Sequence, residues 1–339
     1  MNKNKKTVLI SNNDTFKWDH DGQKYCLHIM SDDDREDSPR DWSPVTTMAC
    51  WHRRYTLGDK IENKGDPTDF WRNLVDETYS AEQLADAVMN GKVPGMRIAV
   101  HENEPEMADL YVTCDLGFGE GPKEYLQRDG VEFRYIGDYI TEELSISQCM
   151  ALMEPHAEWL PLWLYDHGGI TMSCGTRSYP YNDAWDSGQV GWIVALKATL
   201  FKEGINELLL DENGEPIRIA HEHQQPDGTV TYTYSCEYKP LGEDNWRKVA
   251  IATMESDVKI YDQYLTGEVY GYQLYKADGV DDDGEIDWVE EDSCWSFYGD
   301  DLMTNGMLDN VGCGLKEALE SGAYEEGEAK LHTCSHYTF

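Results

Sequence analysis

Residues 260–301, IYDQYLTGEVYGYQLYKADGVDDDGEIDWVEEDSCWSFYGDD, contain the end of a helix, a tight turn and two aromatic strands. Apolar residues around the helix recur at i, i+3, i+7, i+10 and i+14, which is the spacing of a single helix face. That face consists of Ile251, Met254, Val258, Tyr261 and Leu265. Gly267 is suited to end the helix, because glycine tolerates the left-handed conformation of a C-terminal cap. The stretch therefore predicts a helix that leads directly into a β-hairpin across residues 277–285.

Outward from this stretch, further hairpins and short helices alternate along the chain. Strands are predicted around turns within residues 7–30, 160–174 and 211–243. In the first of these hairpins we expect residues 7–11 to form a strand and residues 12–22 to be rich in turns. A helical segment is predicted over residues 66–91, where Ser80 and Gln83 match a capping box.

These elements together predict one α+β domain over residues 1–339. We expect a mixed or mainly antiparallel sheet with helices packed on one face, plus an inserted β-hairpin. Residues 60–140 and 211–243 are expected to be elaborations of this core.

The charge of the chain is far from that of an average globular protein. Its 339 residues include 65 acidic and 28 basic side chains, for a formal net charge of -37. Self-repulsion of this size opposes compaction, which points to solubility, a halophilic source, or a negative surface directed at a basic partner. Direct binding to nucleic acid is disfavoured, because phosphate contacts need clusters of Lys and Arg, and the only basic runs are residues 3–6 and 52–54.

The nine cysteines are scattered along the chain without any C-x-x-C pair. This spacing argues against a disulfide framework and against a zinc ribbon, and it favours free buried thiols in a reducing cytoplasm. The first apolar run is too short for a secretion signal, and no apolar window has the length of a transmembrane helix. We therefore expect a cytoplasmic protein without membrane contact.

Five strings spread along the chain carry a resemblance to a known family. They are DSPRDW with MACWHRRYTLGD (37–59), LPLWLYDHGGITMS (160–173), WDSGQVGWI (185–193), YDQYLTGEVYGY (261–272) and DSCWSFYG (292–299). In this order they resemble a family of acidic proteins encoded by phages and mobile elements. The family is usually shorter, and the extra length falls in residues 60–140 and 211–243. The resemblance implies a phage or mobile-element origin, with the host cytosol as the compartment, and it implies no particular reaction.

One interpretation of the residues near the turn at 166–169 is a thiol hydrolase. Cys174 would be the nucleophile, His167 the base and Asp186 the carboxylate that orients the base, which are the roles that activate a thiol. No nucleophile elbow or protease signature surrounds Cys174. The alternative is a hydrogen-bonded turn with a structural thiol.

A metal site is a second enzymatic interpretation. His221 and His223 alternate on one predicted strand, with Cys236 on the partner strand, but a third and fourth ligand of fixed spacing are missing. The alternative is an exposed hairpin face. The same alternation recurs in HTCSH, residues 332–336. No cofactor is expected, because the glycine cluster at 117–121 lacks the lysine of a phosphate loop.

Two further segments have open interpretations. CWHRRY, residues 50–55, brings cationic side chains into a very acidic chain. They either bind an anion or pair with internal carboxylates such as Asp37, Asp41 or Asp59. WDSGQ, residues 185–189, is dense in donors and acceptors, and it either lines a ligand site or forms an Asx turn before a buried strand.

The acidic connection at residues 278–292 is the expected partner-binding region. Its carboxylates lie beside aromatic residues, a composition common in interfaces, although a solvated turn has the same composition. Carboxylates on a rigid β-scaffold can imitate a row of DNA phosphates, and the acidic loop at residues 32–41 would extend that row. The expected contact residues are Asp281, Asp282, Asp283, Glu285, Asp287, Trp288, Glu290, Glu291, Asp32, Asp33 and Asp34.

The function favoured by the sequence is that of a non-enzymatic phage or mobile-element accessory protein. It would bind and inhibit a host protein that has a basic surface or nucleic-acid groove, such as a defence enzyme, by presenting a surface that mimics DNA. A thiol- or metal-dependent hydrolase is the alternative, and a structural or accessory virion protein is a further one.

Overall fold

The computed structural model describes residues 6–33, 37–114, 123–175, 185–212, 214, 216–224, 230–280 and 284–328. The chain has an α+β fold, as predicted, and all strand pairs among these residues are antiparallel. No helix in this part of the chain is long and apolar enough to cross a membrane.

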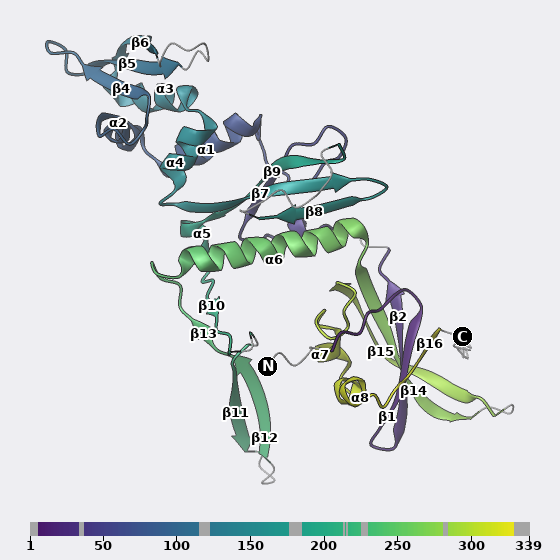
Figure 1. Cartoon of the computed structure of the whole chain (residues 1–339). Helices are drawn as coiled ribbons and strands as arrows, with labels where there is room; N and C mark the ends of the chain where they lie inside the picture. Colours follow the sequence, from purple (N-terminus) through teal and green to yellow (C-terminus); the bar gives the residue numbers. More distant parts are fainter. Residues whose placement is uncertain are drawn as a thin grey trace, which may run out of the picture.

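A four-stranded sheet lies at the centre of the molecule (Figure 1). Across the sheet its strands are β3 (Thr47–Cys50), β9 (Ser187–Leu196), β7 (Ala157–Asp166) and β8 (Ile170–Cys174). Helix α6 (Trp246–Thr266) runs along one face of this sheet. The predicted apolar stripe packs there, with Met254, Val258 and Tyr261 buried. The helix ends at Gly267 in the left-handed conformation (φ 82°), as predicted.

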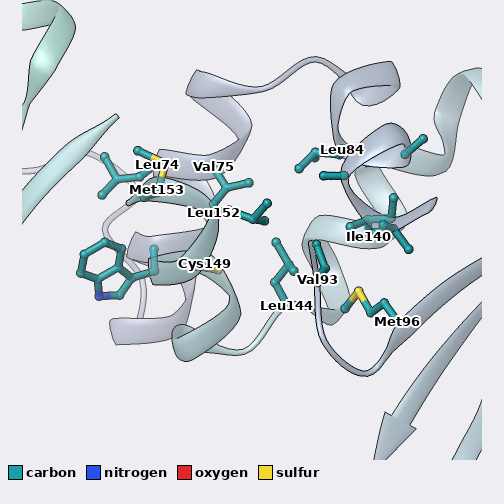
Figure 2. Close-up of a cluster of buried hydrophobic side chains, with 14 of the residues drawn as sticks. Leu74, Val75, Leu84, Val93, Met96, Ile140, Leu144, Cys149, Leu152 and Met153 are labelled. Carbon is teal, nitrogen blue, oxygen red and sulfur yellow. The ribbon is translucent and has the colours of Figure 1, made fainter. Parts of the chain in front are cut away.

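The opposite face of the same sheet packs against α1 (Pro67–Thr78), which belongs to a second group of helices. In this group α4 (Ile146–Met153) packs on α1, whereas α2 (Ala81–Met89) and α3 (Ile136–Glu143) pack on each other, farther from the sheet (Figure 1). Trp71 of α1 is fully buried and meets Trp159 and Trp192 of the sheet edge to face, with ring centroids 5.3 and 5.9 Å apart. Figure 2 shows how apolar side chains of this group, including Val75, Leu84 and Ile140, interlock.

Helices therefore pack on both faces of the central sheet, where helices on one face were expected. The reason is that β7 and β9 carry apolar residues on both sides: Leu160 and Leu162 face α6, and Trp159 and Val194 face the α1–α4 group. Much of that second cover comes from residues 60–140, so this segment is packed into the core.

A small sheet and three short elements complete this half of the molecule. The sheet consists of β4 (Met96–Val100), β5 (Met107–Cys114) and β6 (Lys123–Glu132). The short elements are η1 (Pro39–Asp41), η2 (Phe133–Tyr135) and α5 (Lys197–Lys202).

A five-stranded sheet forms the other part of the molecule (Figure 1). Across the sheet its strands are β15 (Ile286–Tyr298), β14 (Val269–Val280), β2 (Gln23–Ser31), β1 (Asp14–His20) and β16 (Glu325–Glu328). Helices α7 (Met307–Val311) and α8 (Leu315–Ser321) cover one face of it. Because Val269 follows Gly267 closely, α6 passes directly into this sheet.

The first strand of that sheet differs from the prediction. Residues 14–20, expected to be rich in turns, form β1, and residues 7–11 contribute only an isolated bridge between Leu9 and Asp301. The turn is Asp21–Gly22, both at positive φ, which suits a two-residue hairpin. Phe16 and Trp18 on β1 are buried, and this burial fixes the register.

The predicted inserted hairpin is β11 (Arg218–Gln224) paired with β12 (Val230–Cys236). It projects away from the central sheet on a two-stranded stem (Figure 1). The stem strands are β10 (Glu207–Leu208) and β13 (Tyr238–Lys239).

Arg40 connects the loop before β3 to helix α6. Its side chain is 3% exposed, and its guanidinium binds Asp59 through two nitrogens (2.7 and 3.0 Å) and Asp257 of α6 (3.1 Å). The sequence suggested Asp59 as one possible partner of the cationic residues at 50–55, but the buried Arg40 binds it.

Candidate functional site

The edge strand β15 lies in a strongly acidic part of the chain. Residues 268–301, which include this strand, contain twelve acidic side chains and a single lysine. Glu290, Glu291 and Asp292 are consecutive and exposed. Successive side chains of a strand point to opposite faces, so carboxylates on one face are about 6.6 Å apart, roughly twice the 3.4 Å of axis per phosphate on one DNA strand. The three carboxylates therefore concentrate negative charge at the edge of the sheet, at a lower density than on one DNA strand.

Contacts within the hairpin fix these carboxylates. Tyr272 Oη donates to Asp292 Oδ2 at 2.9 Å, and Lys276 Nζ lies 3.3 Å from Glu291 Oε1. The register shifts between Leu274 and Tyr275 on β14, so Glu291 is the extra residue of a β-bulge. A bulge on an exposed edge disfavours pairing with another strand. The edge is therefore suited to side-chain recognition more than to strand addition.

An acidic cleft lies between the end of α6 and the end of β15. It has a volume of about 580 Å³, and its charged lining residues are Lys259, Asp262, Glu268, Asp300 and Asp301. Burial, and then the negative charges of Asp300 and Asp262, raise the pKa of Glu268 above its ordinary range. Burial also raises the pKa of Asp262, whose carboxylate accepts a hydrogen bond from Met172 N at 2.6 Å. A cationic group placed in the cleft would relieve this like-charge crowding.

The sequence did not single out the residues of this cleft. Asp262 is near the end of α6, Glu268 follows the cap at Gly267, and Asp300 comes directly after β15. In the sequence, these acidic residues are notable only because they lie near the predicted end of a helix and the end of a strand. The β14–β15 hairpin brings these two ends together.

The expected contact residues fall into three groups. Asp34, Asp281, Asp282 and Asp283 lie outside the described residues. Asp33, Glu285, Glu290 and Glu291 are exposed, and Asp287 and Trp288 are half-buried. Lys17 Nζ lies 5.8 Å from the ring centroid of Trp288, so this indole has an internal partner.

Asp32 was expected to contact a partner at the surface, but it is buried. It is 8% exposed, and its carboxylate accepts hydrogen bonds from Ser296 N (3.1 Å) and Ser296 Oγ (3.3 Å). Because Ser296 is at positive φ (68°), this carboxylate supports an unusual backbone conformation in β15. Asp32 is therefore a buried structural residue that stabilises the backbone of β15.

Of the proposed thiol-hydrolase residues, the structure brings two together and leaves the third apart. His167 Nδ1 lies 2.8 Å from Asp186 Oδ2. Cys174 pairs with Leu162, whereas the turn that carries His167 begins after Asp166. Four residues of strand separate the thiol from the turn, about 13 Å. Burial raises the pKa of Cys174 to about 11. This geometry does not support a thiol nucleophile at Cys174.

The proposed metal ligands also separate. His221 and His223 share one face of β11, where their Nε2 atoms contact Ser235 Oγ and Thr233 Oγ1 at 2.7 and 2.8 Å. Cys236 pairs with Arg218, three residues from His221, and therefore projects from the other face. No group of three or more His, Cys, Asp or Glu side chains is placed to hold a metal within the described ranges. The HTCSH segment at 332–336 lies outside those ranges.

The chain matches no protein-family model, no curated protein and no solved structure.

Proposed function

We propose that this chain is an accessory protein of a phage or mobile element that binds a basic surface of a host protein. The observation that carries the proposal is the exposed run Glu290–Glu291–Asp292 on a bulged edge strand, whose C-terminal end lines an acidic cleft. The surrounding residues 268–301 offer only Lys276 to compensate this charge. The overall charge of -37 and the resemblance of the five strings to acidic phage proteins support the same reading.

The recognition we propose is electrostatic. The carboxylates of β15 attract the Lys and Arg side chains that would otherwise contact phosphates, and the acidic cleft takes one cationic side chain. Such a surface inhibits a nucleic-acid or defence enzyme by occupying its groove. This function needs no catalytic step.

A binding experiment with matched charge variants tests the proposal. The site variant is Glu285→Gln/Glu290→Gln/Glu291→Gln, and the control is Asp309→Asn/Glu317→Gln/Glu320→Gln, which removes three exposed charges from α7, α8 and their surroundings. Tagged wild-type protein captures partners from host lysate at about 50 mM NaCl, within the range where surface charges act over about 10 Å or more. Each captured partner is then purified and its Kd is measured for all three proteins.

We expect the site variant to lose at least about tenfold in affinity and the control to lose little, because rim charges act locally. Raising NaCl to about 300 mM should weaken the wild-type complex strongly. Equal losses for both variants, or a complex insensitive to salt, would contradict recognition by the β15 surface.

A further inference from the structure

Two segments that the sequence singled out separately meet at one cavity on the central sheet. CWHRRY (50–55) continues from β3, and WDSGQ (185–189) leads into β9. They are held together by the hydrogen bond from Trp51 N to Val190 O, 2.6 Å. Together with the end of β7 they line a cavity of about 270 Å³. We call it the Arg53 pocket; its polar lining comes mainly from His52, Arg53, Arg54, Asp166, Asp186 and Gln189.

The two carboxylates of the Arg53 pocket are already engaged. Asp166 binds the guanidinium of Arg54 and accepts a hydrogen bond from Tyr55 Oη at 3.2 Å. Asp186 lies 2.8 Å from Nδ1 of His167. The positive charge of Arg54 offsets the negative charge of Asp166, which would otherwise disfavour an anion.

Arg53 is the cation that remains. Its side chain is exposed at the cavity and has no ion-pair partner among the residues that the structure describes. In a chain with 65 acidic and 28 basic side chains, an arginine near two carboxylates but paired with neither is available for an external anion.

His52 supplies a second donor. Its Nδ1 accepts hydrogen bonds from Arg54 N (3.4 Å) and Tyr55 N (3.3 Å), and its ring stacks on Tyr55 with centroids 5.0 Å apart. Since Nδ1 accepts, the proton of the neutral ring is on Nε2, which can donate. The hydrogen bonds of the turn thus hold the ring in place and assign its tautomer.

We propose that the Arg53 pocket binds a small oxyanion, a phosphate or carboxylate group, through the Arg53 guanidinium and His52 Nε2–H. Guanidinium groups bind such anions through two parallel hydrogen bonds. A volume of about 270 Å³ admits the oxyanion with a small substituent. Trp185, 96% exposed at the rim, offers an indole face to a planar substituent. The site is distinct from the acidic surface of β15.

Calorimetric titration with inorganic phosphate tests the proposal at about 150 mM NaCl, where the field of the distant acids is screened beyond about 8 Å. Wild-type protein should bind phosphate saturably at one site. Arg53→Ala should weaken the binding at least about tenfold, as expected for a charge-assisted hydrogen bond. The control Arg134→Ala, which removes an exposed arginine paired with Glu132, should bind like the wild type.

A second arm uses phenyl phosphate. It should bind more tightly than inorganic phosphate, and Trp185→Phe should reduce that difference, because indole is the larger stacking surface. The absence of saturable phosphate binding, or an Arg53→Ala protein that binds as well as the wild type, would overturn the proposal. The Glu285→Gln/Glu290→Gln/Glu291→Gln protein should keep its phosphate affinity, so this result is separate from that of the partner-binding experiment.

Discussion

Arg40 links three parts of the chain around the central sheet. Its buried guanidinium binds two carboxylates, Asp59 from the loop after β3 and Asp257 from α6, and also the carbonyl oxygen of Thr46. Asp59 in turn accepts from Met48 N at 2.8 Å. One cation therefore holds a loop, a strand and a helix together.

We predict that Arg40→Met lowers the free energy of unfolding by about 3–5 kcal/mol, because two carboxylates are left without their buried partner. Urea denaturation followed by circular dichroism measures this loss. The control Arg134→Met breaks an exposed pair with Glu132 and should cost less than about 1 kcal/mol. Equal stabilities of the two variants would refute the structural role of Arg40.

Glu268 should make stability depend on pH. Its folded pKa is raised above the ordinary value of 4.5, so the folded protein takes up its proton more readily than the unfolded chain. The charged form therefore costs stability at neutral pH, and this cost disappears as pH falls through the raised pKa towards 4.5.

We predict that Glu268→Gln stabilises the protein at pH 7 and that the gain shrinks towards pH 4. Urea denaturation at several pH values measures both effects. Glu317→Gln on α8 removes an exposed charge and serves as the control. A gain for Glu268→Gln that does not change with pH would contradict the assigned cause.

Single residues were predictable from the sequence where their partners are local. His167, after β7, and Asp186, before β9, lie at neighbouring strand ends and are in contact. Asp32, in contrast, looked like a surface acid. Its partner Ser296 is far away in the sequence, and nothing in the acidic loop indicates that contact.

At the scale of elements, β9 depends on the absence of one side chain. A Cβ added at Gly191 would lie 1.8 Å from the carbonyl oxygen of Ala49, which belongs to the neighbouring strand β3. Gly188, on the same strand, has no atom within 4 Å of such a Cβ. Gly188 therefore serves as a control for Gly191, because the two glycines share a strand and differ in the space around them.

We predict that Gly191→Ala destabilises the protein by about 1–3 kcal/mol or more, because the backbones of β3 and β9 must move apart. Gly188→Ala should change stability by less than about 0.5 kcal/mol. Thermal unfolding of both variants is the measurement. Similar melting temperatures would show that β3 is not packed against β9 as described.

Elements with strong local signals were predicted well. The stripe of α6 and its stop at Gly267, and the capping box of Ser80 and Gln83, are all present. Strand β1 was missed, because two asparagines precede its sequence DTFKWDH and only Phe16 and Trp18 in it are apolar. Its strand conformation comes from β2 and from β16, and the second of these lies near the other end of the chain.

At the scale of the whole molecule, the net charge of -37 opposes the compact state. We predict that the melting temperature rises as NaCl is increased from about 10 to 300 mM, since the screening length falls from about 30 Å to below 10 Å. Differential scanning calorimetry at constant pH measures this. A falling melting temperature would mean that ion pairs such as Arg54–Asp166 outweigh the repulsion.

The α+β fold class was predicted from the sequence, but the division of the main strands into a four-stranded and a five-stranded sheet was not. Alternating hairpins predict antiparallel pairing wherever the strands are close in sequence, as in β7–β8 and β11–β12. The covering of the central sheet on both faces depends on which helices reach Trp159 and Trp192, and the periodicity of one helix carries no information about its partner.

The five-stranded sheet has a consequence for synthesis of the protein on the ribosome. Strand β2 pairs with β14, which is translated about 240 residues later, and β1 pairs with β16 later still. At about 5–20 residues per second, the first hairpin waits roughly 10–50 s for its neighbours. An isolated hairpin is marginally stable in water. The nascent chain therefore exposes the apolar face of β1 and β2 during most of translation, and this interval is when chaperones and proteases have access to it.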